Sequence, residues 1–79
     1  MIQRKDVPVN DEYSIAIVTE AMADGSWAVV TSIKHRSSTG EQVTDLPIQT
    51  DRYATQPAAE QAGLTQAQSW LTDNVPHAA

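Results

Sequence analysis

Apolar and polar residues alternate along two stretches of this chain of 79 residues, and the two stretches lie close together. Residues 12–22 read EYSIAIVTEAM and residues 26–36 read SWAVVTSIKHR, both rich in β-branched and aromatic side chains. A period of two is typical of a strand that buries one face. Asp24 and Gly25 separate the stretches and are typical of a tight turn, so the pattern predicts an antiparallel hairpin.

The length of this first turn decides which side chains share a face of the sheet. A two-residue loop at Asp24 and Gly25 sets Ile15 opposite Lys34, which mixes apolar and polar side chains. A three-residue loop over 23–25, with Gly25 left-handed in a bulge, slips the register by one residue. Because burial favours the register that keeps apolar side chains together, we predict the three-residue loop and these pairs: Ile15–Ile33, Ile17–Thr31, Thr19–Val29 and Ala21–Trp27.

A third and weaker stretch, EQVTDLPIQT over residues 41–50, contains Pro47. Proline cannot donate a ladder hydrogen bond, so we expect an edge strand or a bulged one. A four-residue loop that ends at a left-handed Gly40 sets Arg36 opposite Glu41. That register predicts two further pairs on the isoleucine face: Leu46 with Thr31 and Ile48 with Val29.

Residues 56–74, QPAAEQAGLTQAQSWLTDN, change to a helical period. Thr55 is suited to cap the start, and Pro57 is tolerated in a first helical turn because its missing N–H has no helical partner there. Pro76 stops the helix. Small side chains come first along the apolar stripe, and the mid-helix Gly63 predicts a close approach of the helix to the sheet. The stripe comprises Ala59, Ala62, Gly63, Ala67, Trp70 and Leu71, with Leu64 beside it.

These elements predict an α+β fold, a three-stranded antiparallel sheet packed on one C-terminal helix in the order β-β-β-α. Residues 1–11 show no clear period, so we expect an extended or flexible N-terminal arm. Residues 12–75 form the single β-β-β-α domain, and residues 76–79 a disordered tail. The helix covers one face of the sheet, which we expect to hold Ile15, Ile17, Trp27, Val29, Ile33, Leu46 and Ile48.

Composition narrows the function without naming it. The chain has no cysteine and carries His35 and His77 far apart, so neither disulfides nor a zinc site is expected to support the core. Its net charge of −5 opposes non-specific attraction to nucleic acid or anionic lipid. No stretch approaches the roughly 20 apolar residues that span a bilayer, and the first residues lack the apolar run of a secretory signal. We therefore expect a soluble cytoplasmic protein that does not associate with membranes.

Residue patterns of catalysis are absent from the sequence, and we expect no enzyme activity, no cofactor and no metal. Gly25, Gly40 and Gly63 are isolated, so no glycine-rich loop is available to hold a phosphate. Apart from the adjacent Asp11 and Glu12, the ten acidic residues are scattered singly, so we expect no carboxylate pair for acid–base chemistry. His35 ends a predicted strand, where we expect a half-exposed ring beside Tyr13 and not a general base.

The uncovered face of the predicted sheet is the best candidate for a functional surface. It groups five apolar residues in an exposed patch of the kind that marks protein interfaces: Ala16, Val18, Met22, Ala28 and Val30. We predict a small protein-interaction module, with a homodimer through this face as one form. Two further possibilities stay open. The N-terminal arm folds back over the patch through Ile2, Val7 and Val9, or the glutamine-rich outer face of the helix takes part in binding.

A second hypothesis uses the other end of the same face, where Lys34 and Arg36 lie. In element order alone, residues 12–74 resemble the sheet-and-helix DNA-binding domains of plant transcription factors and integrases, which lay a sheet into the major groove. The resemblance implies a weak nucleic-acid or regulatory binder that uses these two cations. Useful affinity needs several phosphate contacts, and the face also carries Glu20, so we rank this hypothesis second.

Overall fold

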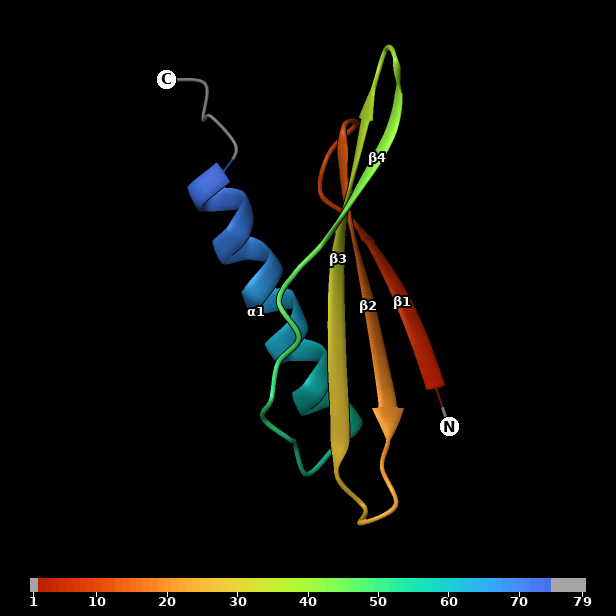
Figure 1. Cartoon of the computed structure of the whole chain (residues 1–79), viewed down its shortest axis with the longest axis vertical. Helices are drawn as coiled ribbons and strands as arrows, with labels where there is room; N and C mark the ends of the chain where they lie inside the picture. The colour runs from red at the N-terminus through yellow and green to blue at the C-terminus, as the bar shows by residue number, and fades with distance from the viewer. Residues whose placement is uncertain (1, 75–79) are drawn as a thin grey trace.

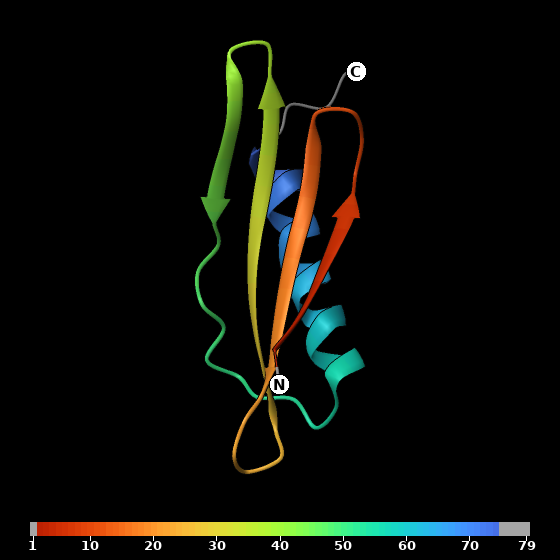
Figure 2. The same cartoon turned by 90° about the vertical axis from the view of Figure 1, so that its right-hand side faces the viewer.

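The structure, a computed structural model, describes residues 2–74, so the predicted tail at residues 76–79 lies outside the described residues. Four antiparallel strands form one sheet in chain order, and one helix crosses a single face of it (Figures 1 and 2). The α+β class, the antiparallel sheet and the C-terminal helix are confirmed, but the predicted count of three strands is wrong. The elements are β1 (Ile2–Pro8), β2 (Tyr13–Ala21), β3 (Trp27–Ser37), β4 (Gly40–Asp45) and α1 (Gln56–Asn74).

The additional strand, β1, comes from the segment that we expected to be an arm. It pairs with β2 along its whole length. Asn10 closes the turn between the two strands, because its Oδ1 accepts the backbone N–H groups of Glu12 (2.8 Å) and Tyr13 (2.9 Å). Within β1 only Val7 is half-buried and the other residues are exposed. An edge strand with so little burial needs no alternation of apolar residues, which explains why the sequence pattern did not predict it.

The first hairpin has the three-residue loop that the sequence predicts. The Met22 N–H donates to the Ser26 carbonyl (2.8 Å), and the Gly25 N–H donates to the Met22 carbonyl (3.1 Å). Gly25 has a φ of +87°, the left-handed conformation that glycine adopts without strain. All four predicted pairs are confirmed: Ile15–Ile33, Ile17–Thr31, Thr19–Val29 and Ala21–Trp27.

The second hairpin has the predicted register, with Arg36 opposite Glu41, and Gly40 has a positive φ of +138°. The predicted four-residue loop is wrong, because Ser37 still pairs with Gly40 and only Ser38 and Thr39 form the turn. Just beyond β4, the Leu46 N–H donates to the Thr31 carbonyl (3.0 Å), and Leu46 is buried in the core.

The predicted place of Ile48 in the core is wrong, because the chain leaves the sheet after Leu46. Ile48 is 72% exposed. The chain returns to β3 only at Tyr53, whose backbone exchanges two hydrogen bonds with Trp27 (2.8 and 3.0 Å). Side-chain amides hold the intervening segment on the helix instead of on β3. Gln66 Nε2 donates to the Pro47 carbonyl (2.8 Å). Gln49 Nε2 donates to Gln66 Oε1 (3.1 Å) and to the Ala62 carbonyl (3.2 Å). The Tyr53 hydroxyl donates to Gln49 Oε1 (2.6 Å).

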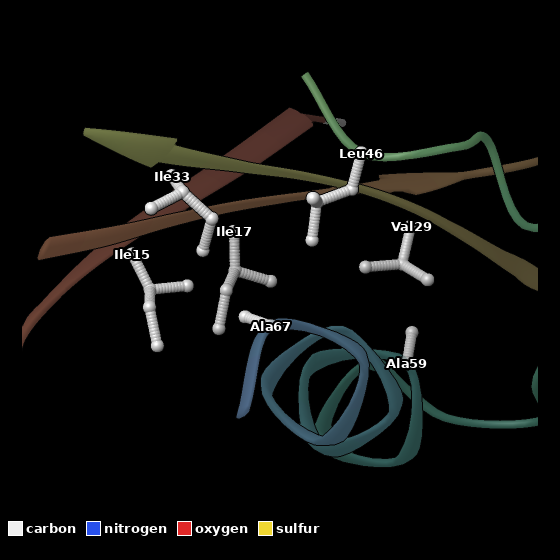
Figure 3. Packing of buried hydrophobic residues seen from close by; sticks show 7 residues of the cluster. All are labelled: Ile15, Ile17, Val29, Ile33, Leu46, Ala59 and Ala67. Carbon is white, nitrogen blue, oxygen red and sulfur yellow. The ribbon is translucent and has the colours of Figure 1, made fainter. Parts of the chain in front are cut away.

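The helix begins with the predicted cap and packs on the two central strands. The Ala58 N–H donates to Thr55 Oγ1 (3.3 Å). The side chains of the core come from β2, β3, α1 and the segment after β4 (Figure 3): Ile15, Ile17, Val29, Ile33, Leu46, Ala59 and Ala67. Trp27, expected in this core, is half-buried at its margin, as are Leu64, Trp70 and Leu71.

Gly63 lies where the helix comes closest to the sheet. It faces Ile17, Val29 and Thr31, all of which are buried. The Thr31 hydroxyl has no hydrogen-bond partner there. The absence of a side chain at Gly63 therefore permits the close approach that its mid-helix position predicts.

An ion pair joins the edge strand β1 to the helix. Lys5 Nζ lies 2.9 Å from Glu60 Oε1, and Gln56 donates to the other carboxylate oxygen of Glu60 (2.9 Å). The hydrogen bond from Lys5, followed by that from Gln56, holds the pKa of the Glu60 carboxyl below its ordinary value. Gln56 also donates to the buried Thr19 hydroxyl (3.3 Å), so this corner of α1 is fixed to both β1 and β2.

Candidate interface on the open sheet face

The face of the sheet that α1 leaves uncovered is called the open face here. Side chains alternate between the faces of a sheet, so the open face takes the even-numbered residues of β1, β2 and β3 and the odd-numbered residues of β4. The registers align these residues in rows across the strands. The first row is Ile2, Glu20 and Ala28; the second is Arg4, Val18 and Val30; the third is Asp6, Ala16, Ser32 and Asp45; the fourth is Pro8, Ser14, Lys34 and Val43.

The structure brings four of the five predicted interface residues together on the open face. Val18 lies directly opposite Val30, and Ala16 and Ala28 occupy the adjacent rows. Val30 is 42% exposed and Val18 half-buried, whereas Ala16 is only 3% exposed because it is a small residue on a central strand between longer neighbours. Met22 follows the end of β2, and its backbone closes the hairpin. Ala16 therefore forms the floor of the patch, and the valines form its contact surface.

Sequence reasoning missed the residues that β1 adds to the open face. Ile2 is 65% exposed and extends the apolar patch, and Arg4 forms an exposed ion pair with Asp6 (3.3 Å). The possibility that this segment covers the patch is contradicted, because β1 lies beside β2 within the sheet. Val7 instead packs against the core on the opposite face, and Val9 is exposed.

The two cations of the nucleic-acid hypothesis lie at the far end of the open face. Lys34 and Arg36 line a hollow of about 420 Å³ together with Glu12 and Glu41. Arg36 is directly opposite Glu41 in the sheet. Acidic residues outnumber basic ones over the whole open face, with Asp6, Glu20, Glu41 and Asp45 against Arg4, Lys34 and Arg36. Such a face does not present the concentrated positive charge that phosphate binding needs.

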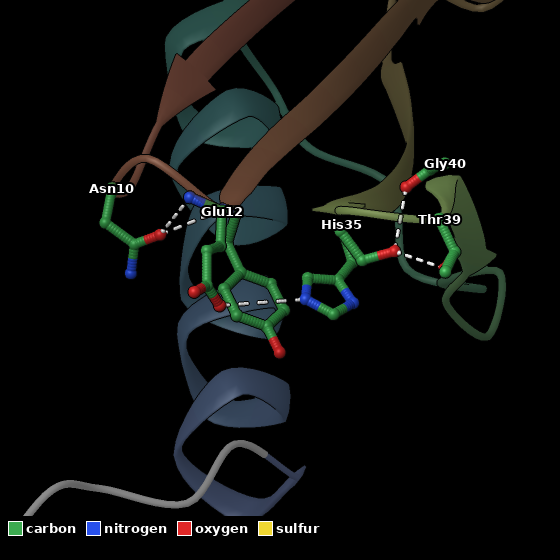
Figure 4. A network of polar contacts seen from close by, with 7 residues as sticks. Asn10, Glu12, His35, Thr39 and Gly40 are labelled. Carbon is green, nitrogen blue, oxygen red and sulfur yellow. Dashed lines mark hydrogen bonds and ion pairs between the residues drawn. The ribbon is translucent and has the colours of Figure 1, made fainter.

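His35 lies on the helix side of the sheet, away from the open face. Its ring stacks on Tyr13 with 4.4 Å between ring centroids, which confirms the predicted half-exposed position beside that residue. Glu12 points toward the imidazole, and its Oε2 lies 3.7 Å from Nε2 (Figure 4). In the same region the Ser37 hydroxyl donates to the Gly40 carbonyl (3.0 Å). These contacts fix the ends of β2 and β3.

The glutamine-rich helix surface is partly used within the chain. Gln66 holds the segment after β4, and Gln56 bonds to Thr19 and Glu60. Gln61 donates to Thr65 one turn further along the helix (3.4 Å). These glutamine side chains thus already form hydrogen bonds within the chain, which leaves fewer of their donors and acceptors for a partner.

Among residues 2–74, no three histidine, aspartate or glutamate side chains gather as the ligands of a metal ion would. Over the same residues, no helix combines the length and the apolar character needed to cross a membrane.

Comparison of the chain with protein-family models, with curated proteins and with solved structures finds no match.

Proposed function

We propose that this protein is a small, non-enzymatic interaction module that binds another protein surface through the open face. The observation that carries this proposal is the one-sided packing of the sheet. α1 covers one face of β2 and β3, while the other face of the same two strands presents Val18 and Val30 side by side. Sheets of globular proteins cover an apolar face with a second layer, and contiguous exposed apolar residues mark interaction sites. A partner would supply that second layer.

A photo-crosslinking residue at position 30 of the full chain tests this proposal. Val30 lies at the centre of the patch, so we expect covalent adducts with protein when cells are irradiated. The matched control carries the same residue at the exposed Gln61 on the outer side of α1. Adducts from position 30 that disappear on Val18→Asp support the proposal. Equal labelling from both positions, or adducts with nucleic acid alone, would contradict it.

A further inference from the structure

Charge and shape on the open face are arranged so that the face complements itself. The second row carries a cation, Arg4, and the third row carries an anion, Asp6, on the same strand. The apolar Val18 stands in the second row, and next to it in the third row is the flat, buried Ala16. If a second copy lies on this face with its strands reversed, the cation and the protruding valine of the second row meet the anion and the flat alanine of the third row.

We propose that the partner is a second copy of this chain, packed on the open face with its strands antiparallel to those of the first. In this arrangement the second row of each copy meets the third row of the other. Arg4 of each copy then lies against Asp6 of the second copy, and Val18 lies over Ala16 of the second copy. Sheets pack face to face with their strand directions within about 30° of each other, so the geometry is an ordinary one. This inference rests on the function proposed for the open face.

Other arrangements of the two copies, shifted by one row along the strands or with the strands parallel, bring like charges together. A shift that opposes the second rows sets Arg4 against Arg4, and a shift that opposes the third rows sets Asp6 against Asp6. Strands running in the same direction would place β1 of one copy over β4 of the other, with Asp6 against Asp45. Like-charge contacts of this kind select against wrong arrangements.

The ends of the face also match in the proposed arrangement, because the first row of one copy meets the fourth row of the other. Ile2, which protrudes from the first row, reaches the rim of the 420 Å³ hollow near Pro8. Glu20 comes to lie near Lys34, which lines that hollow. A protruding apolar side chain thus meets a hollow, and the Glu20 carboxylate meets Lys34, one of the two cations that line it beside Glu12 and Glu41.

The size of the face sets the expected affinity. With strands about 4.8 Å apart and a rise of about 3.3 Å per residue, the four rows, two of which contain no residue of β4, cover roughly 450 Å² in plan. Specific interfaces bury about 800 Å² of accessible surface on each partner, and weaker, transient ones bury less. We therefore expect a reversible dimer with a dissociation constant of about 1 µM or weaker, readily measured by sedimentation.

Charge reversal at two exposed positions tests the arrangement directly. Arg4→Asp gives a chain with two anions on the open face of β1, and Asp6→Arg gives one with two cations on that face. Each variant alone should dimerise at least about tenfold more weakly than the wild type, because two attractive pairs per dimer become repulsive. In an equimolar mixture the two variants should form a heterodimer close to wild-type affinity, detected by sedimentation and by native mass spectrometry. Arg52→Asp changes the charge by the same amount outside the open face and should leave dimerisation unchanged.

Val30→Asp separates face-to-face packing from pairing of two β1 edges, since Val30 lies on β3. It should abolish the dimer, while circular dichroism shows that every variant keeps its fold. A dimer that survives Val30→Asp, or charge variants that show no rescue on mixing, would overturn the proposed packing. A wild-type chain that stays monomeric at about 1 mM would overturn self-association. If position 30 still crosslinks to other proteins in that case, the proposed interaction function stands without it.

Discussion

Replacement of Gly63 by alanine tests how closely the helix must approach the sheet. A Cβ at this position would lie 2.8 Å from Thr31 Oγ1, 2.9 Å from Val29 Cγ2 and 3.0 Å from Ile17 Cγ2. Favourable carbon contacts lie at about 3.5–4.0 Å. All three neighbours are 1% exposed, so none can swing into solvent. The helix must instead move outward, which loosens the packing of Ala59 on the core.

Two opposing effects set the size of the change in stability on Gly63→Ala. Alanine in a helix interior is favoured over glycine by about 1 kcal/mol. Overpacking of a well-packed core costs about 1–3 kcal/mol, and three simultaneous close contacts place Gly63→Ala toward the upper end. We expect a net loss of about 1–2 kcal/mol in the free energy of unfolding. For a domain of this size, that loss lowers Tm by roughly 5–15 °C.

Urea and thermal unfolding, followed by circular dichroism, measure this change. The pair Gln68→Ala and Gln68→Gly, at an exposed position in the interior of the same helix, is the control, and the two variants should differ by about 1 kcal/mol through helix propensity alone. Thr31→Ala removes the nearest atom, a hydroxyl without a partner, and should recover part of the loss when combined with Gly63→Ala. A Gly63→Ala variant that is as stable as the wild type or more stable would refute the close approach.

Three further predictions concern the turn, the cap and the ion pair. Gly25→Ala should destabilise the protein by about 1 kcal/mol in chemical unfolding, with Gly25→Asn less affected, because the left-handed φ strains alanine although the surrounding space is open. Thr55→Ala should cost about 1 kcal/mol and fray the first turn of α1 in hydrogen exchange, because the capping hydroxyl is lost. The contribution of Glu60 should be present above its ordinary pKa of 4.5 and lost as pH falls through the lower folded value. A pH series of unfolding curves should show this loss, and Lys5→Met should reduce it.

The registers of the two hairpins could be predicted because glycine and burial act on the same short segment. Gly25 permits the left-handed conformation, and only one of the possible loop lengths brings Ile15 opposite Ile33. The helix could be predicted equally well, because its signals are local. Thr55 is suited to cap its start, Pro57 is tolerated in its first turn, and the small residues around Gly63 permit close packing on the sheet. Register and helix position together define which face of the sheet stays open.

Segments that are held by polar contacts could not be predicted in the same way. β1 is exposed on both faces apart from Val7, so its residues carry no apolar period. The local signal that was available is Asn10, a turn-forming residue placed between two extended stretches. Ile48 was misplaced because apolar character suggested burial, whereas the Gln49 and Gln66 amides direct its segment onto the helix. Long-range amide bonds of this kind leave no periodic pattern in a sequence.

The missing strand also explains why the candidate surface was incomplete. Four of the predicted residues share the open face, but the charges that give the face a direction, Arg4 and Asp6, lie on β1. Without β1, the patch is a small group of valines and alanines without the Arg4 and Asp6 charges that fix the register proposed for a second copy.

Methyl NMR with a paramagnetic additive in the solvent tests most directly whether the open face is an interface. The methyl groups of Ile15, Ile17 and Ile33 should be protected from the additive at every protein concentration. Those of Val18 and Val30 should be accessible in dilute solution and become protected as the concentration rises. Valine methyls that stay equally accessible at all concentrations, with and without cell extract, would contradict the account.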